Sequence, residues 1–233
     1  MPGISVQFGS ERVADSSVTP KKGGGMKEGD KRLSKKKIRI AKAGANLFSK
    51  KGFAETSMED ISAAAKLSKA GIYHYFSSKT DLLFFILDSF MDIVLDNLEE
   101  ELDAINDGMA KVRRFIFRHV ELYPKHMSEA KTLFFDAKNL PPRLFNAIVQ
   151  KERKYNQIAV KVLSENFGFS AEKDRATTIT YIILSMCNSI YAWYNPKCTI
   201  KPEDLSEIIF KMLTAGVLEL PKGKAAGRSV KKR

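Results

Sequence analysis

Several features that mark other classes of protein are scarce or missing in this sequence. Only two of its 233 residues are cysteines, Cys187 and Cys198, and neither belongs to a Cys-x-x-Cys pattern. A disulfide scaffold is therefore not expected, and a reducing cytoplasm suits the chain. No run approaches the roughly eighteen apolar residues of a membrane-spanning helix, and the N-terminus lacks the basic start and apolar stretch of a signal peptide. We therefore expect a cytoplasmic protein with no membrane partner.

Catalytic and metal-binding signatures are missing as well. The sequence shows no pairing of a nucleophile with a base, no compact metal-ligand spacing and no Gly-rich phosphate loop. Acidic residues gather between Asp96 and Asp107, but their spacing is typical of a solvated helix face rather than of a metal site. We expect neither an enzyme nor a protein that carries a cofactor or a metal.

What the chain does contain is helical periodicity and an uneven distribution of charge. Apolar residues recur at helical spacing, and no strand pattern occurs, so the predicted fold is all-α. The formal net charge is +12, and residues 1–81 hold 16 Lys and Arg against 8 Asp and Glu. The tail after residue 218 is also basic, whereas the residues between are nearly neutral. This asymmetry indicates that one end meets a polyanion while the middle has another task, although basic termini can also be simple solubilising tails.

The segment 56–76 predicts two short helices joined by a tight turn. Thr56 and Glu59 have the spacing of a capping box, and Ser68 is the N-cap expected for the second helix. A helix over residues 38–51, closed by Gly52, precedes this pair. Two short helices with a connection of three or four residues form a helix-turn-helix, whose second helix can enter the major groove of DNA.

The sequence divides into four predicted segments: a disordered extension (1–30), a helix-turn-helix domain (31–80), a helical domain (81–220) and a basic disordered tail (221–233). The codons implied by residues 21–25 resemble a ribosome-binding site before Met26, so we hypothesise that translation starts at Met26. In the large domain the pattern predicts helices over residues 78–106, 109–123, 127–137, 142–167, 171–194 and 203–218. Pro124 is expected to end the second of these, Pro142 to open the fourth and Gly168 to close it.

Residues 35–83 resemble the TetR family of transcriptional regulators. The resemblance lies in Ala-Asn-Leu-Phe-Ser-Lys-Lys-Gly-Phe (45–53), Thr-Ser-Met-Glu-Asp-Ile (56–61), Ser-Lys-Ala-Gly-Ile-Tyr-His-Tyr-Phe (68–76) and Ser-Lys-Thr-Asp-Leu-Leu (78–83). It implies a three-helix DNA-binding head, a helical ligand-binding and dimerisation domain, and a homodimer formed through the last two helices. Two heads would then address half-sites of a pseudo-palindromic double-stranded operator.

The resemblance also implies which residues meet DNA. Helix N-termini and long cations suit phosphates and guanine edges, and basic residues before the first helix add salt-dependent affinity. The expected DNA-binding residues are Lys36, Lys37, Thr56, Ser57, Ser68, Lys69, Ala70, Gly71, Tyr73, His74 and Lys79. We expect Tyr73→Ala and Lys79→Ala to abolish operator binding without unfolding the protein.

In the family a small effector binds inside the second domain and shifts the spacing of the heads. The candidate ligand-binding residues are Phe115, His119, Phe134, Phe135, Tyr155, Tyr181, Asn188 and Trp193, although most aromatic residues in a helical bundle are plain core. The segment 188–196, which ends Trp-Tyr-Asn-Pro, resembles regulators that respond to acyl-CoA or related lipid thioesters. Arg113, Arg114, Arg118 or Arg143 could hold the phosphates of such a ligand.

Two functional readings remain after this resemblance. The favoured one is a ligand-responsive regulator, a repressor released from its operator by a hydrophobic effector. The alternative is a non-specific architectural DNA-binding protein, which would not need a large neutral aromatic domain. Footprinting separates them, because a short palindromic protection indicates a regulator and uniform coating indicates an architectural protein.

Overall fold

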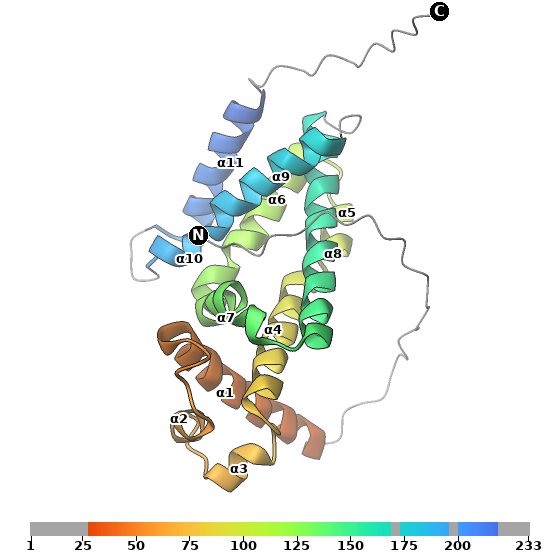
Figure 1. Ribbon diagram of the computed structural model, residues 1–233. Helices are drawn as coiled ribbons and strands as arrows, with labels where there is room; N and C mark the ends of the chain where they lie inside the picture. Colours follow the sequence, from red (N-terminus) through yellow and green to blue (C-terminus); the bar gives the residue numbers. More distant parts are fainter. Residues whose placement is uncertain (1–27, 169–172, 196–199, 219–233) are drawn as a thin grey trace, which may run out of the picture. The chain divides into compact units, whose positions relative to one another are not determined.

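The computed structural model describes residues 28–168, 173–195 and 200–218, and within these residues all regular structure is helical (Figure 1). The chain separates into two compact units. Unit 1 holds residues up to Leu87 together with Lys131–Pro141, and unit 2 holds Asp88–Ala130 and the residues from Pro142 onward. The division falls within α4 and α7. The prediction of an all-α fold is confirmed.

Unit 1 contains α1 (Glu28–Lys51), α2 (Met58–Ala64), α3 (Lys69–Tyr73), the first half of α4 (Lys79–Leu95), the end of α7 (Leu122–Asp136) and the 3₁₀ turn Ala137–Asn139. Its fully buried side chains come from each of α1 to α4 and include Phe48, Ile61, Ile72 and Leu82. These apolar residues hold the two short helices against α1 and α4. As predicted, α1 ends at a glycine, and Gly52 has a φ of +85°.

The helix-turn-helix begins one residue later than the sequence suggested. The N-cap of α2 is Ser57, whose hydroxyl accepts from the backbone N–H of Asp60 at 3.0 Å, while the Asp60 carboxylate accepts from the N–H of Ser57. The capping box predicted for Thr56 and Glu59 is therefore wrong. The predicted N-cap of α3 is confirmed, because Ser68 Oγ accepts from the N–H of Gly71 at 3.0 Å.

Unit 2 is built from the rest of α4 and of α7, α5 (Leu98–Asp103), α6 (Gly108–Val120), α8 (Pro142–Phe167), α9 (Lys173–Asn188), α10 (Ile190–Trp193) and α11 (Pro202–Leu218). α6 packs against both α8 and α11, and α8 also packs against α9. Its core is apolar and includes Val112, Phe115, Ile158 and Ile183. α8 opens at Pro142 and is followed by Gly168 with a φ of +75°, as predicted.

Several helix boundaries differ from the prediction. The helix expected over residues 78–106 is split, because Asn97 takes a left-handed φ of 50° between α4 and α5. Pro124 lies in the first turn of α7, where proline is tolerated, and the backbone kink falls at His126 instead. α1 begins at Glu28, so the last residues of the extension predicted to be disordered are helical. Met26 and the basic tail 221–233 lie outside the described residues.

Candidate nucleic-acid interface and effector site

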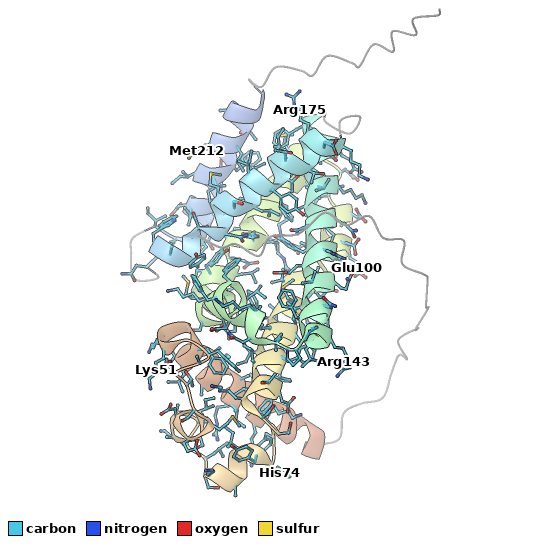
Figure 2. All side chains as sticks on the ribbon, in the orientation of Figure 1. Lys51, His74, Glu100, Arg143, Arg175 and Met212 are labelled. Carbon is cyan, nitrogen blue, oxygen red and sulfur yellow. The ribbon has the colours of Figure 1, made fainter. Side chains whose placement is uncertain are left out.

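The surface of the helix-turn-helix displays most of the residues predicted to meet DNA. Ser57, Ser68, Lys69 and Ala70 are exposed, as is Tyr73, while Gly71 is partly covered. His74, which follows α3, is also exposed (Figure 2). In α1, Lys36 is exposed, and the Lys37 ammonium lies 5.7 Å from the centre of the Phe76 ring. Ser68 and Lys69 open a helix N-terminus, which offers free N–H groups to an anion.

Lys69 is held by an acidic neighbour on α2. Its ammonium forms an ion pair with Glu59, and this contact raises the pKa of Lys69 and lowers the pKa of Glu59. Both side chains are more than half exposed, so the pair is screened by solvent. A phosphate or guanine that binds Lys69 must compete with Glu59 for the ammonium.

Thr56 is a correction to the predicted interface. Its side chain is 1% exposed, and its hydroxyl donates to the Gly52 carbonyl at 2.8 Å. The hydroxyl therefore closes the turn after α1 and is not displayed to DNA.

Lys79 is occupied within unit 1. Its ammonium donates to the carbonyl oxygens of Phe53 and Thr56 at 2.7 Å and of Ala54 at 3.2 Å. It also lies 4.4 Å from the centre of the Phe53 ring. Its contact with DNA stays a prediction, but the expectation that Lys79→Ala leaves the fold untouched no longer follows.

Unit 2 brings four of the predicted ligand-binding residues into one group, of which Phe115, His119 and Tyr155 are buried and Asn188 is partly buried. His119 Nδ1 lies 2.6 Å from the Tyr155 hydroxyl, and Phe115 stacks on the Tyr155 ring. His119 Nε2 lies 3.4 Å from the hydroxyl of Tyr123, which donates to Asn188 Oδ1 at 3.1 Å. We call His119, Tyr123, Tyr155 and Asn188 the polar chain.

The contacts of the polar chain fix a direction for its hydrogen bonds. Because Tyr123 donates to Asn188, its oxygen can accept from an N–H at His119 Nε2, which leaves Nδ1 to accept from Tyr155. Burial lowers the pKa of His119 to about 4, so the ring is neutral at pH 7. The polar chain ends at the Asn188 amide, which is only partly buried.

The other predicted ligand-binding residues are not part of this group. Phe134 and Phe135 belong to unit 1, and Phe135 is 52% exposed. Trp193 in α10 is 57% exposed, and its indole N–H lies 3.4 Å from Ser189 Oγ. Tyr181 is partly buried on α9. Pro196, the end of the motif around Trp193, lies outside the described residues.

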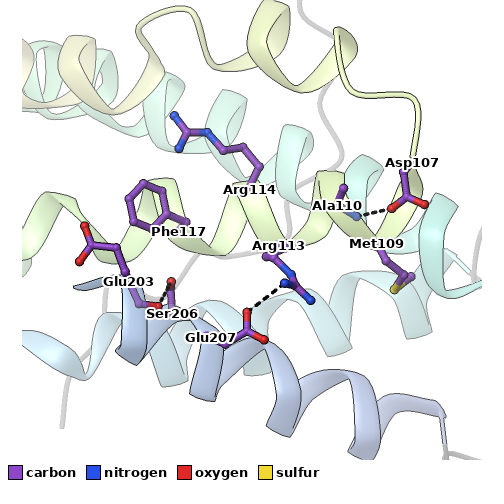
Figure 3. Close-up of a pocket in the computed structure, with 9 residues that line it drawn as sticks. All are labelled: Asp107, Met109, Ala110, Arg113, Arg114, Phe117, Glu203, Ser206 and Glu207. Atoms are coloured by element: carbon purple, nitrogen blue, oxygen red, sulfur yellow. Dashed lines mark hydrogen bonds and ion pairs between the residues drawn. The ribbon is translucent and has the colours of Figure 1, made fainter. Parts of the chain in front are cut away.

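A separate cavity of about 480 Å³ lies between α6 and α11 (Figure 3). Arg113 crosses it to Glu207 at 3.4 Å and stacks over Phe210, while Arg114 pairs with Glu101. The lining is Asp107, Met109, Ala110, Arg113, Arg114, Phe117, Glu203, Ser206 and Glu207. None of these was among the eight predicted ligand-binding residues, because the packing of α11 on α6 has no local sequence signal. Arg113 and Arg114, suggested as phosphate ligands, are already paired.

Neither a metal cluster nor a spanning helix is found where the structure describes the chain. No group of three or more His, Cys, Asp or Glu side chains could hold a metal ion there. No helix there is long and apolar enough to cross a membrane.

A helix-turn-helix followed by a helical unit is the arrangement of a DNA-binding regulator, and sequence comparisons agree. Residues 40–85 match the family of bacterial regulatory proteins called the tetR family, and residues 106–217 match the Tetracyclin repressor-like C-terminal domain. The chain belongs to the TetR family of transcriptional regulators. It is a DNA-binding regulator from a family that is not enzymatic, and both predictions are confirmed.

Individual relatives are more distant. The chain is 36% identical over 73 residues to the regulator YerO of Bacillus subtilis, a match that covers 30% of this chain and 25% of that protein. It is 20% identical over 180 residues to the transcriptional activator FasR of Mycolicibacterium smegmatis, covering 77% and 81%. The crystal structure of AibR in complex with isovaleryl coenzyme A and operator DNA has a TM-score of 0.64 at 23% identity, covering 76% of this chain and 97% of that one. That likeness shows the fold.

Proposed function

We propose that this regulator is a homodimer that binds a pseudo-palindromic operator through α2 and α3 and is released as a repressor when a hydrophobic effector binds unit 2. The observation that carries the proposal is the polar chain: three buried hydrogen-bonding side chains and the partly buried Asn188, joined in the unit outside the DNA-binding head. A non-specific architectural protein would gain nothing from such a group, whereas a ligand site needs a few polar groups within apolar walls.

We further propose an acyl-CoA or a similar thioester as the effector. Every member of the polar chain is neutral at pH 7, and Arg118, which is close in sequence, is engaged with Asp96 and Glu101. A buried carboxylate needs a charged partner, so an uncharged carbonyl that accepts from the Asn188 amide suits this group better than a free acid does. The liganded AibR complex gives the same class of effector on the same fold.

Exposed apolar side chains support the homodimer. Ile182 on α9 is 64% exposed, and on α11 Ile208 and Met212 are 47% and 62% exposed; Met212 projects outward from its helix (Figure 2). Large apolar side chains that recur on two helices mark a surface for a partner. A second copy of the chain, packed about a two-fold axis, would cover it.

Footprinting and operator release test the proposal. DNase protection on the DNA upstream of the regulator's own gene should show one short palindromic site. Decanoyl-CoA should release the protein from that site, whereas decanoate and free CoA should not.

Asn188→Ala should weaken the response to decanoyl-CoA and leave operator affinity unchanged. Tyr194→Phe, which removes a hydroxyl bonded elsewhere in unit 2, is the control and should respond normally. Uniform coating of the DNA would contradict the regulator, and release by decanoate alone would contradict the thioester.

A further inference from the structure

The helix-turn-helix depends on its surroundings for its position. α2 has seven residues and α3 has five, and helices this short do not persist without tertiary contacts. The segment that leads into them is the connector, which we define as residues 52–56. It contains no regular structure, so side chains from elsewhere must fix its course.

Lys79 holds the connector from the start of α4. Its ammonium has three donors, and the carbonyl oxygens of Phe53, Ala54 and Thr56 take all three. The contact with the Phe53 ring at 4.4 Å adds a cation–π interaction. One side chain thus binds three carbonyl oxygens of the connector.

Asp136, at the end of α7, is a second side chain that holds the connector. Its Oδ1 accepts from the backbone N–H of Phe53 at 3.1 Å, across 83 positions of sequence. The end of α7 that carries it is itself fixed, because Asn139 donates to the Asp136 carbonyl at 3.0 Å.

Burial of the Asp136 carboxylate beside the connector costs desolvation free energy. Its side chain is 6% exposed, and Oδ2 has no hydrogen-bond partner among the described residues. Burial raises the pKa of Asp136, against the opposing effects of the Phe53 N–H, Lys138 and Lys79. A buried and incompletely paired charge contributes little net stability. The position of the Asp136 carboxylate is better explained by its hydrogen bond to the connector at Phe53.

We propose that Lys79 and Asp136 form a connector clamp that positions α2 and α3 for operator binding without touching DNA. The inference rests on the proposal that α3 reads the operator, and it reassigns Lys79 from a phosphate contact to a positioning residue. Loss of the clamp lowers the fraction of molecules in the binding-competent arrangement, so operator affinity falls in proportion.

The first test uses the sign of the charge. Replacing an acidic residue in a DNA-binding unit should strengthen binding if only electrostatics mattered. The clamp predicts the reverse for Asp136→Ala: operator affinity, measured by fluorescence anisotropy, falls about tenfold. Asp136→Asn keeps an oxygen for the Phe53 N–H and should retain most of the affinity. Glu55→Ala removes the same charge from an exposed side chain of the connector and should bind at least as tightly as the wild type.

The second test separates positioning from contact at Lys79. Removal of a phosphate contact lowers the slope of log affinity against log salt by about 1. The clamp predicts that Lys79→Met binds the operator more weakly with an unchanged slope. A reduced slope would instead place Lys79 on a phosphate and overturn its part in the clamp.

Folding and the DNA interface are monitored separately. Thermal unfolding compares the stability of each variant with that of the wild type. If Asp136→Ala is not fully helical at the assay temperature, Asp136→Ser takes its place in the comparison with Asp136→Asn. Unchanged affinity in folded Asp136→Ala, or equal losses in Asp136→Ala and Asp136→Asn, would overturn the clamp. If Tyr73→Ala binds normally while Asp136→Ala does not, Tyr73 is not part of the DNA interface, and the clamp stands as a separate result.

Discussion

At the scale of single residues, the side chains that face solvent on α3 have a different status from those that hold it. Tyr73 is 44% exposed, whereas its neighbour Ile72 is fully buried. A side chain of the first kind can be changed without disturbing the core, and one of the second kind cannot. Exposure therefore sorts the predicted DNA contacts into those that mutation can test cleanly and those that it cannot.

Tyr73→Ala should weaken operator binding by at least about tenfold, because one good contact to DNA contributes roughly 1–3 kcal/mol. The temperature of unfolding should stay within about two degrees of the wild type, since surface changes alter stability little. Anisotropy with labelled operator and differential scanning calorimetry measure the two quantities. Ile72→Ala is the contrasting variant and should lower the unfolding temperature. Normal operator affinity in Tyr73→Ala would remove Tyr73 from the interface.

Two titratable groups in unit 2, the buried His119 and the partly buried Glu152, make stability depend on pH in opposite directions. Burial lowers the pKa of His119 to about 4 and raises the pKa of Glu152 to about 7. Between about pH 6.5 and pH 4 the unfolded chain binds a proton at His119 that the folded protein refuses, so the free energy of unfolding falls as pH falls. Between about pH 4.5 and pH 7 the folded protein keeps a proton on Glu152 that the unfolded chain releases, so the free energy of unfolding falls as pH rises.

Because these effects oppose each other, each must be measured as a difference between wild type and variant. Relative to His119→Gln, the wild type should lose on the order of 3 kcal/mol of unfolding free energy between pH 7 and pH 4. Relative to Glu152→Gln, it should lose stability as pH rises from 4.5 to 7. Urea denaturation over a pH series gives both differences. Curves that run parallel for wild type and variant would contradict the assignment.

At the scale of secondary-structure elements, the capping box of α2 can be tested by single substitutions. Ser57→Ala leaves the N–H of Asp60 without its acceptor and should lower the free energy of unfolding by about 1 kcal/mol. The control is Ser49→Ala, whose hydroxyl donates only to the Asn46 carbonyl within α1 and whose loss should change little. Urea denaturation measures both, and equal losses would deny Ser57 the role of a cap.

The same element shows what could and could not be predicted from sequence. Thr56 with Glu59 and Ser57 with Asp60 have identical spacing, so spacing alone does not choose between them. The choice follows from the turn at Gly52, whose carbonyl engages the Thr56 hydroxyl and leaves Ser57 to cap. Ser68 had no such rival, and its prediction was right. The break at Asn97 has only a weak local signal, because asparagine takes a left-handed φ more often than most residues but does not always do so.

The candidate effector site was predictable only in part for the same reason. Phe115, His119, Tyr155 and Asn188, which the structure brings together, were proposed from sequence because they are aromatic or polar residues within apolar helices. Tyr123 was missed because Pro124 made it look like a helix end, yet it connects His119 to Asn188. The cavity between α6 and α11 depends on two helices far apart in sequence, and periodicity within one helix does not say which partner it meets.

At the scale of the whole molecule, the proposed two-fold assembly determines how the heads reach DNA. A glutamate in the middle of an apolar dimer surface is buried without a partner, so Ile182→Glu with Met212→Glu should convert the dimer to a monomer. Operator affinity should fall with it, because one head reads one half-site. Ile93→Glu introduces the same charge at a 41% exposed position on α4 and should remain dimeric. Sedimentation velocity measures the state, and a dimer in the double variant would move the interface elsewhere.

The reactivity of the buried Cys187 thiol reports how often unit 2 opens locally. The thiol is 2% exposed beside the polar chain, and burial raises its pKa to about 12, so the closed unit gives an alkylating reagent neither access nor thiolate. Modification must wait until α9 parts from its neighbours. In a Cys198→Ser background, the labelling rate at Cys187 therefore measures the frequency of these openings. A ligand that binds at Asn188, the next residue, should make the openings rarer and lower this rate. The affinity of an unknown effector can thus be measured from the decrease in the Cys187 labelling rate, without operator DNA.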